Sequence, residues 1–307
     1  MPEQRIQLQP ELTGIALAYR NENCIADKVL PKVQVGKLSF QYRKFDKGTF
    51  LTLEDTKVGE KGMPQRIETK AKLITDTLDE HALEDVIAVS RKNEIEKDSL
   101  NSSEILTAQL TDCLKLRREV ELANIMTNTA NYEGNFKSLS SSEKISSSSS
   151  DAAKIIMSAM DAVLKKPNKM VLSRRAFTAL RQNPSILAGV NKNSSTQGVA
   201  SLEGIKDLFD LDEILIGESV ANTSKKKDAL NIQACWQNDI VLLHVDKNAT
   251  NKYGVSFGYN AFKDDITIMS YFDGRIGSQG AEVYKAYMSE KYIISCPECG
   301  YLLKDVI

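Results

Sequence analysis

The sequence predicts a mixed α+β fold with extended outer parts and a smaller compact lobe. Two alternating strand patterns flank a turn-rich segment in the first quarter of the chain, and one long helical pattern follows them. Beyond that helix, short apolar runs alternate with helical patterns, as in an α/β lobe. We therefore expect two lobes, with the order of elements an arm, a long hairpin, a long spine helix, an α/β lobe and a closing strand.

The composition is that of an ordinary folded protein. The chain has 307 residues, of which 42% are hydrophobic and 26% are charged, and this excludes a chain that is disordered throughout. With 40 Lys and Arg against 41 Asp and Glu, the net charge of -1 gives no general attraction to nucleic acid or to membranes. Neither a run of about 18 apolar residues nor a signal-peptide pattern is present, so we expect no membrane partner and synthesis in the cytoplasm.

Residues 1–36 are expected to form an extended arm. They alternate weakly between polar and apolar residues and contain Pro2, Pro10 and Pro31, so they have little core of their own. Residues 37–82 are expected to form an extended β-hairpin loop around a turn-rich tip at 54–64.

The two strands of this hairpin each have one apolar face. The predicted apolar faces are Leu38, Phe40 and Tyr42 on the first strand, and Ile67, Thr69, Ala71 and Leu73 on the second. A hairpin of this length is marginal in water by itself. It therefore needs another surface, either its own chain or a neighbouring copy.

A long helix is predicted over about 101–127. Asn101 and Glu104 have capping-box spacing, and apolar residues then recur every three or four positions. The charged stretch from Lys115 to Glu119 is interpreted as a solvated face. A helix of this length spans close to 40 Å and would form a spine for the domain that contains it.

The stretch from 131 to 150 is rich in Asn and Ser and ends in five serines. Its composition is typical of a solvated linker or surface loop, and a binding site for a decorating protein is the alternative for the Ser-rich insert at 138–150.

From residue 151 onward the pattern is α/β. Asp151 is expected to cap a helix, and short buried strands alternate with further helices after it. The expected strands are 169–172, 213–217, 238–245, 255–261, 266–270 and a strand-like stretch over 283–307, and the further helices are 174–182 and 202–209.

Cys296-Pro297-Glu298-Cys299 has the spacing of a zinc half-site or of a redox pair. No second cysteine pair and no histidine cluster lies near it in the sequence, and Cys24, Cys113 and Cys235 are scattered. We interpret Cys296 and Cys299 as ordinary residues of a turn, with a metal site or a thiol link between subunits as alternatives. No cofactor and no metal are expected.

No motif predicts an enzyme. The segment Gly254–Gly258 matches the G-x-S-x-G pattern of a hydrolase nucleophile elbow, but it lies within an alternating strand, and both histidines of the chain, His81 and His244, precede Ser256. The basic run 225–227 is interpreted as an exposed loop tip, with binding of DNA phosphates as the alternative.

Several local motifs follow one another in a fixed order over some 280 residues. They are Ile25–Pro31 with Val33 and Val35, Val58–Lys61 with Pro64, Leu114–Val120, Met170–Ser173, Phe177 with Leu180, Gln182–Pro184 with Ile186, Leu208–Asp212, Ile216–Glu218, Val255–Gly258 and Gly300–Val306. In this order they resemble the major capsid proteins of tailed phages, which have the Hong Kong 97-like fold, and most closely the lambda-E-like and Mu-like prophage capsid relatives.

The resemblance implies a division of the chain. The arm (1–36) and the extended loop (37–82) would reach over neighbouring subunits. Residues 83–150 and 275–307 would form a peripheral domain with the spine helix, and residues 151–274 would form an axial domain. The implied inter-subunit contacts are Ile25, Leu30, Phe40, Tyr42, Lys57, Val58, Lys61 and Pro64. Lys57 or Lys61 would match the hairpin lysine that some relatives crosslink to an asparagine of a neighbour.

The implied function is structural. The protein would self-assemble into hexamers and pentamers of an icosahedral shell that encloses double-stranded DNA, which it would contact without sequence specificity. Portal, scaffold and decoration proteins are the implied partners, with the scaffold as a separate protein. The shell would assemble in the host bacterial cytoplasm and end in the virion. The alternatives are an encapsulin-like compartment shell or, in a different class, a small thiol or zinc protein centred on Cys296 and Cys299.

Overall fold

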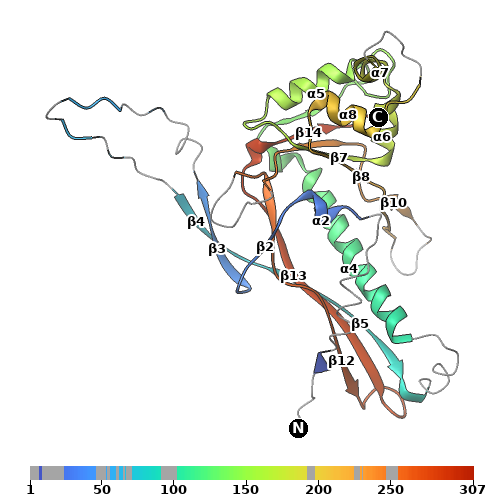
Figure 1. The fold of residues 1–307 in the computed structure, drawn as a ribbon. Coiled ribbons are helices and arrows are strands. Elements are labelled where there is room, and N and C mark those ends of the chain that lie inside the picture. The colour runs from blue at the N-terminus through green and yellow to red at the C-terminus, as the bar shows by residue number, and fades with distance from the viewer. Residues whose placement is uncertain are drawn as a thin grey trace.

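A computed structural model describes residues 7–8, 24–45, 53, 56–59, 62–64, 66, 71–90, 102–191, 198–224, 229, 231–246 and 255–307. These residues form an elongated molecule with an α/β lobe at one end, a long sheet at the other and a hairpin that projects to one side (Figure 1). The predicted α+β class is confirmed.

The long sheet is built around two strands, β12 (Gly258–Asp273) and β13 (Ala281–Ile294), which pair antiparallel from end to end. The strand order is β1-β12-β13-β5, where β1 is Gln7–Leu8 and β5 is Asp79–Ala88. A short parallel strand, β2 (Lys32–Gln34), lies beside β12 and brings the arm onto the sheet.

The two strands predicted at 255–261 and 266–270 belong to the single strand β12. Its register against β13 shifts between Phe262 and Asp264 and again between Asp264 and Thr267. Such bulges change the phase of the alternation while the backbone stays extended. The sequence pattern therefore showed two short runs where the strand is continuous.

The spine helix is α4 (Ser102–Met126), within one residue of the prediction at each end. Leu110 and Leu114 pack with apolar residues of β12 and β13, whereas Leu122 and Met126 pack in a core cluster of the α/β lobe. At about 1.5 Å per residue the helix is about 38 Å long, so it spans the length between the two parts of the molecule (Figure 1).

The lobe contains a five-stranded sheet in the order β6-β14-β11-β7-β8. Its strands are β6 (Phe136–Ser138), β7 (Lys169–Ser173), β8 (Glu213–Gly217), β11 (Ile240–Leu243) and β14 (Gly300–Lys304). The helices packed on it are α5 (Ala152–Asp161), α6 (Arg174–Gln182), α7 (Pro184–Asn191) and α8 (Leu202–Phe209). The predicted Asp151 cap is confirmed, since its side chain accepts from the Lys154 backbone N–H. The sequence analysis missed α7.

Both faces of this sheet are buried. Met170 and Leu172 of β7 lie in the core beneath the helices, whereas Val171 points to the cluster that contains the C-terminal end of α4. A two-stranded sheet, β9 (Val220–Asn222) with β10 (Ile232–Ala234), lies beside the lobe.

Strands of the predicted peripheral range (83–150 and 275–307) pair with strands of the predicted axial range (151–274). β12 lies in the predicted axial range but pairs with β13 of the long sheet. β6 and β14 lie in the predicted peripheral ranges but belong to the lobe sheet. Alternation along the chain predicts a strand but does not report its partner, which is set by long-range contacts.

The segment 131–150 is packed on the lobe through a few buried residues, while more than half of its residues are exposed, as predicted for a surface loop. After the 3₁₀ helix η2 (Thr129–Tyr132), β6 pairs with β14, and Leu139 and Ile145 are buried in the lobe core. The buried amide of Asn183 donates to the backbone carbonyls of Ile145 at 2.9 Å and Ser150 at 3.2 Å. Leu139, Ile145 and the Asn183 amide thus hold the polar segment 131–150 on the lobe.

The projecting hairpin consists of β3 (Ser39–Phe45) and β4 (Ala71–Thr77), which pair only with each other among the described residues. Residues 67–70 of the predicted second strand lie outside the described residues, and the strand is described from Ala71 onward. The predicted inward face of that strand was wrong. Tyr42 pairs with Ile74 and Phe40 with Asp76, so the even-numbered residues of β4 share the inward face, and Leu73 is exposed.

Candidate functional site

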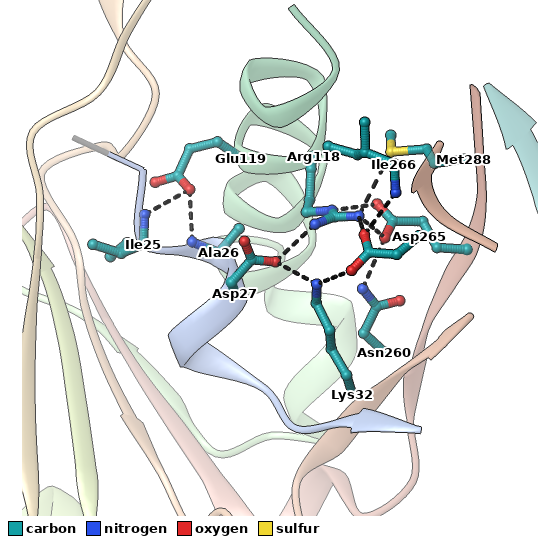
Figure 2. Close-up of polar contacts among 11 residues, drawn as sticks. Ile25, Ala26, Asp27, Lys32, Arg118, Glu119, Asn260, Asp265, Ile266 and Met288 are labelled. Atoms are coloured by element: carbon teal, nitrogen blue, oxygen red, sulfur yellow. Dashed lines mark hydrogen bonds and ion pairs between the residues drawn. The ribbon is translucent and has the colours of Figure 1, made fainter. Parts of the chain in front are cut away.

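Two adjacent charged residues of α4, Arg118 and Glu119, join segments that are far apart in the sequence. Figure 2 shows both side chains at the junction of the arm, the spine helix and the long sheet. Both are buried, with exposed fractions of 3% and 0%. The sequence analysis interpreted them as part of a solvated face, and that interpretation was wrong for these two positions.

The Arg118 guanidinium contacts three carboxylates. Its Nε donates to Glu290 Oε1 at 2.9 Å, its Nη1 to Asp27 Oδ1 at 2.8 Å and its Nη2 to Asp265 Oδ1 at 2.8 Å (Figure 2). Asp27 belongs to the arm, Asp265 to β12 and Glu290 to β13. The planar fork of arginine suits such convergent acceptors. One side chain therefore joins the arm and the two central strands to the spine helix.

Lys32 completes this charge cluster. Its Nζ lies 3.1 Å from Asp27 Oδ1 and 2.9 Å from Asp265 Oδ2. Burial by itself would raise the pKa of Asp265, but Arg118 and Lys32 outweigh it and hold that pKa well below its ordinary range. Burial would likewise lower the pKa of Arg118, and the surrounding carboxylates reverse that effect and raise it. Both shifts favour the charged forms of Asp265 and Arg118.

Glu119 holds the start of the arm helix α2 (Ala26–Val29). Its Oε2 accepts from the backbone N–H groups of Ile25 at 2.9 Å and Ala26 at 2.7 Å. Its Oε1 accepts from Ser219 Oγ at 3.2 Å and from Trp236 Nε1 at 2.5 Å. Because α2 has no side-chain cap of its own, Glu119 satisfies the N–H groups that the start of a helix leaves unpaired.

Three of the predicted inter-subunit contacts are buried within their own chain. Ile25 and Leu30 lie in the cluster around the C-terminal end of α4, and Phe40 packs with Tyr259 of β12. Tyr42 is half-buried and makes an edge-to-face contact with Tyr259, with ring centroids 6.5 Å apart. This chain therefore covers Ile25, Leu30 and Phe40 and part of Tyr42, whereas Leu73 of the second strand stays exposed.

The hairpin base is fixed to the long sheet, whereas described residues of its tip are exposed. Lys291 Nζ of β13 donates to Asp76 Oδ1 at 2.6 Å. The predicted contacts Lys57, Val58 and Pro64 are exposed, and Lys61 lies outside the described residues. Two further apolar side chains of the tip, Leu53 and Met63, are 98% and 95% exposed. Apolar side chains gathered at a projecting tip are typical of a contact with another molecule.

The other candidate sites have ordinary surroundings. Ser256 is buried at the start of β12, where its Oγ donates to the Gly258 carbonyl at 3.1 Å, which is not the exposed elbow of a hydrolase. Cys296 and Cys299 lie next to each other, with their sulfurs 3.2 Å apart. Across the described ranges, no group of three or more His, Cys, Asp and Glu side chains is placed to hold a metal ion, and no helix is long and apolar enough to cross a membrane. The run 225–227 lies outside the described residues.

The sequence contained a signal for the Arg118 junction. Arg118 lies four residues after Leu114 and four before Leu122, so it occupies the same stripe of the helix as those two buried leucines. A charged residue on an apolar stripe is buried only when it is paired. Its partners, Asp27, Asp265 and Glu290, come from distant positions that periodicity could not connect with it.

Comparison with known proteins identifies the family. No protein-family model matches the chain. The major capsid protein of Pseudomonas phage JBD67 is 30% identical over 303 residues, covering 98% of this chain and 97% of the relative. This chain belongs to the phage major capsid proteins. The major capsid protein of Burkholderia phage BcepMu is 26% identical over 309 residues, covering 97% and 96% of the two chains.

Solved structures agree on the fold of this major capsid protein. A phage-related protein from Bordetella bronchiseptica superposes with a TM-score of 0.75 at 21% identity over 99% of both chains. The capsid protein of cyanophage P-SCSP1u has a TM-score of 0.56 at 12% identity, covering 91% and 87% of the two chains. The Hong Kong 97-like capsid fold that the resemblance implied is confirmed.

The encapsulin alternative has support from the fold alone. The SrpI encapsulin of Synechococcus elongatus has a TM-score of 0.55 at 10% identity, covering 99% of this chain and 91% of the encapsulin. Because relatives over nearly the whole length are phage capsid proteins, the phage function is the one supported by sequence. The protein is a virion component that builds a shell from many copies.

Proposed function

We propose that this capsid protein assembles into hexamers and pentamers of a closed icosahedral shell around double-stranded DNA. The observation that carries this proposal is the projecting hairpin, whose base is bound to β13 and whose tip presents nearly fully exposed apolar side chains. In a free monomer these apolar side chains remain in water, whereas in a shell a neighbouring subunit can bury them. In this proposal the protein catalyses no reaction.

The hairpin suits a subunit that must occupy both kinds of ring. Its two strands pair with each other and not with the long sheet, so its direction can change while the sheet stays intact. Lys57, Val58 and Pro64 would lie in the contact with a neighbour. Ile25, Leu30 and Phe40 would support that contact from beneath, because they fix the arm and hairpin base to the body.

The proposed partners follow from this role. Portal and scaffold proteins would join the shell during assembly in the host cytoplasm, and a decoration protein would bind its outside. The near-zero net charge favours a weak, non-specific contact with packaged DNA over tight binding.

Electron microscopy of the protein, co-expressed with the neighbouring head genes, tests the proposal. We expect closed particles or capsomer rings in negative stain, and nuclease-protected double-stranded DNA in particles from infected cells. Particles filled with a protein cargo instead of DNA would favour the encapsulin alternative. If only small discrete species form with scaffold present, the shell function is wrong.

A further inference from the structure

The turn between β13 and β14 brings two thiols together. Cys296 precedes the 3₁₀ helix η3 (Pro297–Cys299), and Cys299 is its last residue. The Cys299 backbone N–H donates to the Cys296 carbonyl at 3.0 Å. In a 3₁₀ turn, side chains three positions apart eclipse each other. The Cys299 thiol accordingly donates to the Cys296 sulfur at 3.2 Å.

The two sulfurs differ in their access to solvent. Cys299 is fully buried, whereas Cys296 is half-buried, so a dissolved reagent reaches Cys296 first. The hydrogen bond to Cys296, together with burial, raises the pKa of Cys299 well above its ordinary value. Cys299 therefore stays protonated until the Cys296 sulfur has reacted.

The surroundings favour a disulfide over a metal site. A structural zinc ion needs four ligands, and no group of three or more His, Cys, Asp and Glu side chains among the described residues is placed to hold a metal ion. The two sulfurs need to approach by only about 1 Å to reach the length of a disulfide bond, about 2.05 Å. One carboxylate opposes the reaction: Cys296 Sγ donates to Glu298 Oε2 at 3.5 Å, and this negative charge disfavours the thiolate.

We propose that Cys296 and Cys299 form an intrachain disulfide by exchange with a low-molecular-weight disulfide such as oxidised glutathione. The Cys296 thiolate attacks one sulfur of the reagent, whose S–S bond breaks and releases one thiolate. Cys299 gives its proton to that thiolate and attacks Cys296 Sγ in the mixed disulfide, which releases the second reagent thiolate; this thiolate takes up, through water, the proton that Cys296 had lost. Two cysteine thiols are oxidised, and one reagent disulfide is reduced to two thiols.

The disulfide would crosslink the turn that connects the long sheet to the lobe sheet. The chain leaves the long sheet at Ile294 and enters the lobe sheet at Gly300. Within this turn, the Leu164 N–H donates to the Glu298 carbonyl at 3.0 Å, and the His244 N–H donates to the Cys299 carbonyl at 2.8 Å. A virion would meet disulfides after it leaves the reducing cytoplasm. That timing rests on the proposed function, whereas the chemistry does not.

Thiol counting on the full-length chain tests the proposal, in free subunits and in particles. The protein is reduced, freed of reductant, incubated with oxidised glutathione and then denatured for titration. We expect peptide mapping to join Cys296 to Cys299, so that the pair loses two of the five thiols, in addition to any loss at the exposed Cys113. Cys299→Ser should stop at a mixed disulfide that carries one glutathionyl group on Cys296. Cys113→Ser is the matched control, which lacks the exposed thiol and should fall from four thiols to two.

Three results would overturn the proposal. Five thiols that persist under oxidised glutathione would show that the pair is inert. Dimers in a non-reducing gel that disappear in Cys296→Ser would show a link between chains. One equivalent of zinc per purified chain, absent from Cys296→Ser, would show a metal site.

Glu298→Gln tests the reaction while both cysteines are still present. Removal of the negative charge beside Cys296 should accelerate the loss of thiols several-fold. Since free subunits suffice, failure here leaves the shell function untouched.

Discussion

Arg118 shows how one residue can determine the relation between distant segments. Three carboxylates and Lys32 surround it, and each of the three belongs to a different element. Removal of charges from water costs free energy that their attraction only partly offsets, so such a cluster contributes more to a defined geometry than to net stability. Removal of Arg118 is much more costly, because Glu290 then remains buried without its cation.

Substitution of Arg118 should therefore destabilise the subunit strongly. We expect Arg118→Met to lower the free energy of unfolding by about 3–5 kcal/mol, because the buried Glu290 then loses its cation while Asp27 and Asp265 share Lys32 alone. Urea unfolding followed by circular dichroism measures the change. The matched control is Arg117→Met, since Arg117 is exposed and pairs only at the surface with Glu121, which is expected to cost less than about 1 kcal/mol. Equal losses in the two variants would contradict a special role for the cluster.

Asp265 should make this cluster sensitive to acid. In the unfolded chain its carboxyl takes up a proton near pH 4, whereas in the folded chain Arg118 and Lys32 keep its pKa lower. The unfolded state therefore binds more protons, and stability falls as the pH decreases through about 5 to 3.

Unfolding midpoints at several pH values check this expectation. Asp265→Asn should be less stable at neutral pH and should show a shallower decline toward pH 3. Asp264→Asn, at the neighbouring position where the carboxylate pairs with Lys263, should keep the wild-type slope. A wild-type slope in Asp265→Asn would show that this carboxylate does not contribute.

Among the elements, those governed by local periodicity could be predicted and those governed by distant partners could not. The apolar spacing of α4 and the cap at Asp151 are properties of a few consecutive residues, and both were predicted closely. The bulges of β12 and the inward face of β4 depend on register with another strand. The junction at Arg118 and Glu119 brings the arm, β12, β13, Ser219 and Trp236 to the spine helix, which no single-sequence pattern could do.

We expect the hydrogen bonds of the Asn183 amide to hold the Ser-rich segment on the lobe. Its amide donates to carbonyls of the 145–150 turn, and Asn183→Asp would place a carboxylate against them. We expect a loss of about 1–3 kcal/mol in unfolding free energy and faster proteolytic cleavage between 139 and 150. The exposed Asn191, at the end of α7, supplies the control Asn191→Asp, which should change neither. Unchanged cleavage in Asn183→Asp would mean that Leu139 and Ile145 alone hold the segment.

For the whole molecule, the important contrast is between a body with buried junctions and a hairpin whose described tip residues are exposed. A change at the tip should alter assembly and leave the free subunit unaffected. We expect Met63→Asp to reduce the yield of closed particles several-fold, because a charge would be buried in the contact with a neighbour. Particle yield is measured by sedimentation and electron microscopy.

The matched control is Met63→Leu, which keeps an apolar side chain at the same place and should assemble normally. Because Met63 is almost fully exposed, both variants should unfold within about 0.5 kcal/mol of the wild type. Normal particle yield in Met63→Asp would place the inter-subunit contact elsewhere on the hairpin.

The bond between Glu119 and Trp236 has a practical consequence, because Trp236 is the only tryptophan of the chain. Its indole is buried beside the start of α2, and a Cβ on Gly217 would lie 2.1 Å from its ring. Any movement of the arm away from the spine helix would change the polarity around this one fluorophore. Trp236 is thus an intrinsic fluorescent probe at the contact between the arm and the spine helix. Its emission spectrum can show, during assembly and without added dye, whether the arm leaves the helix.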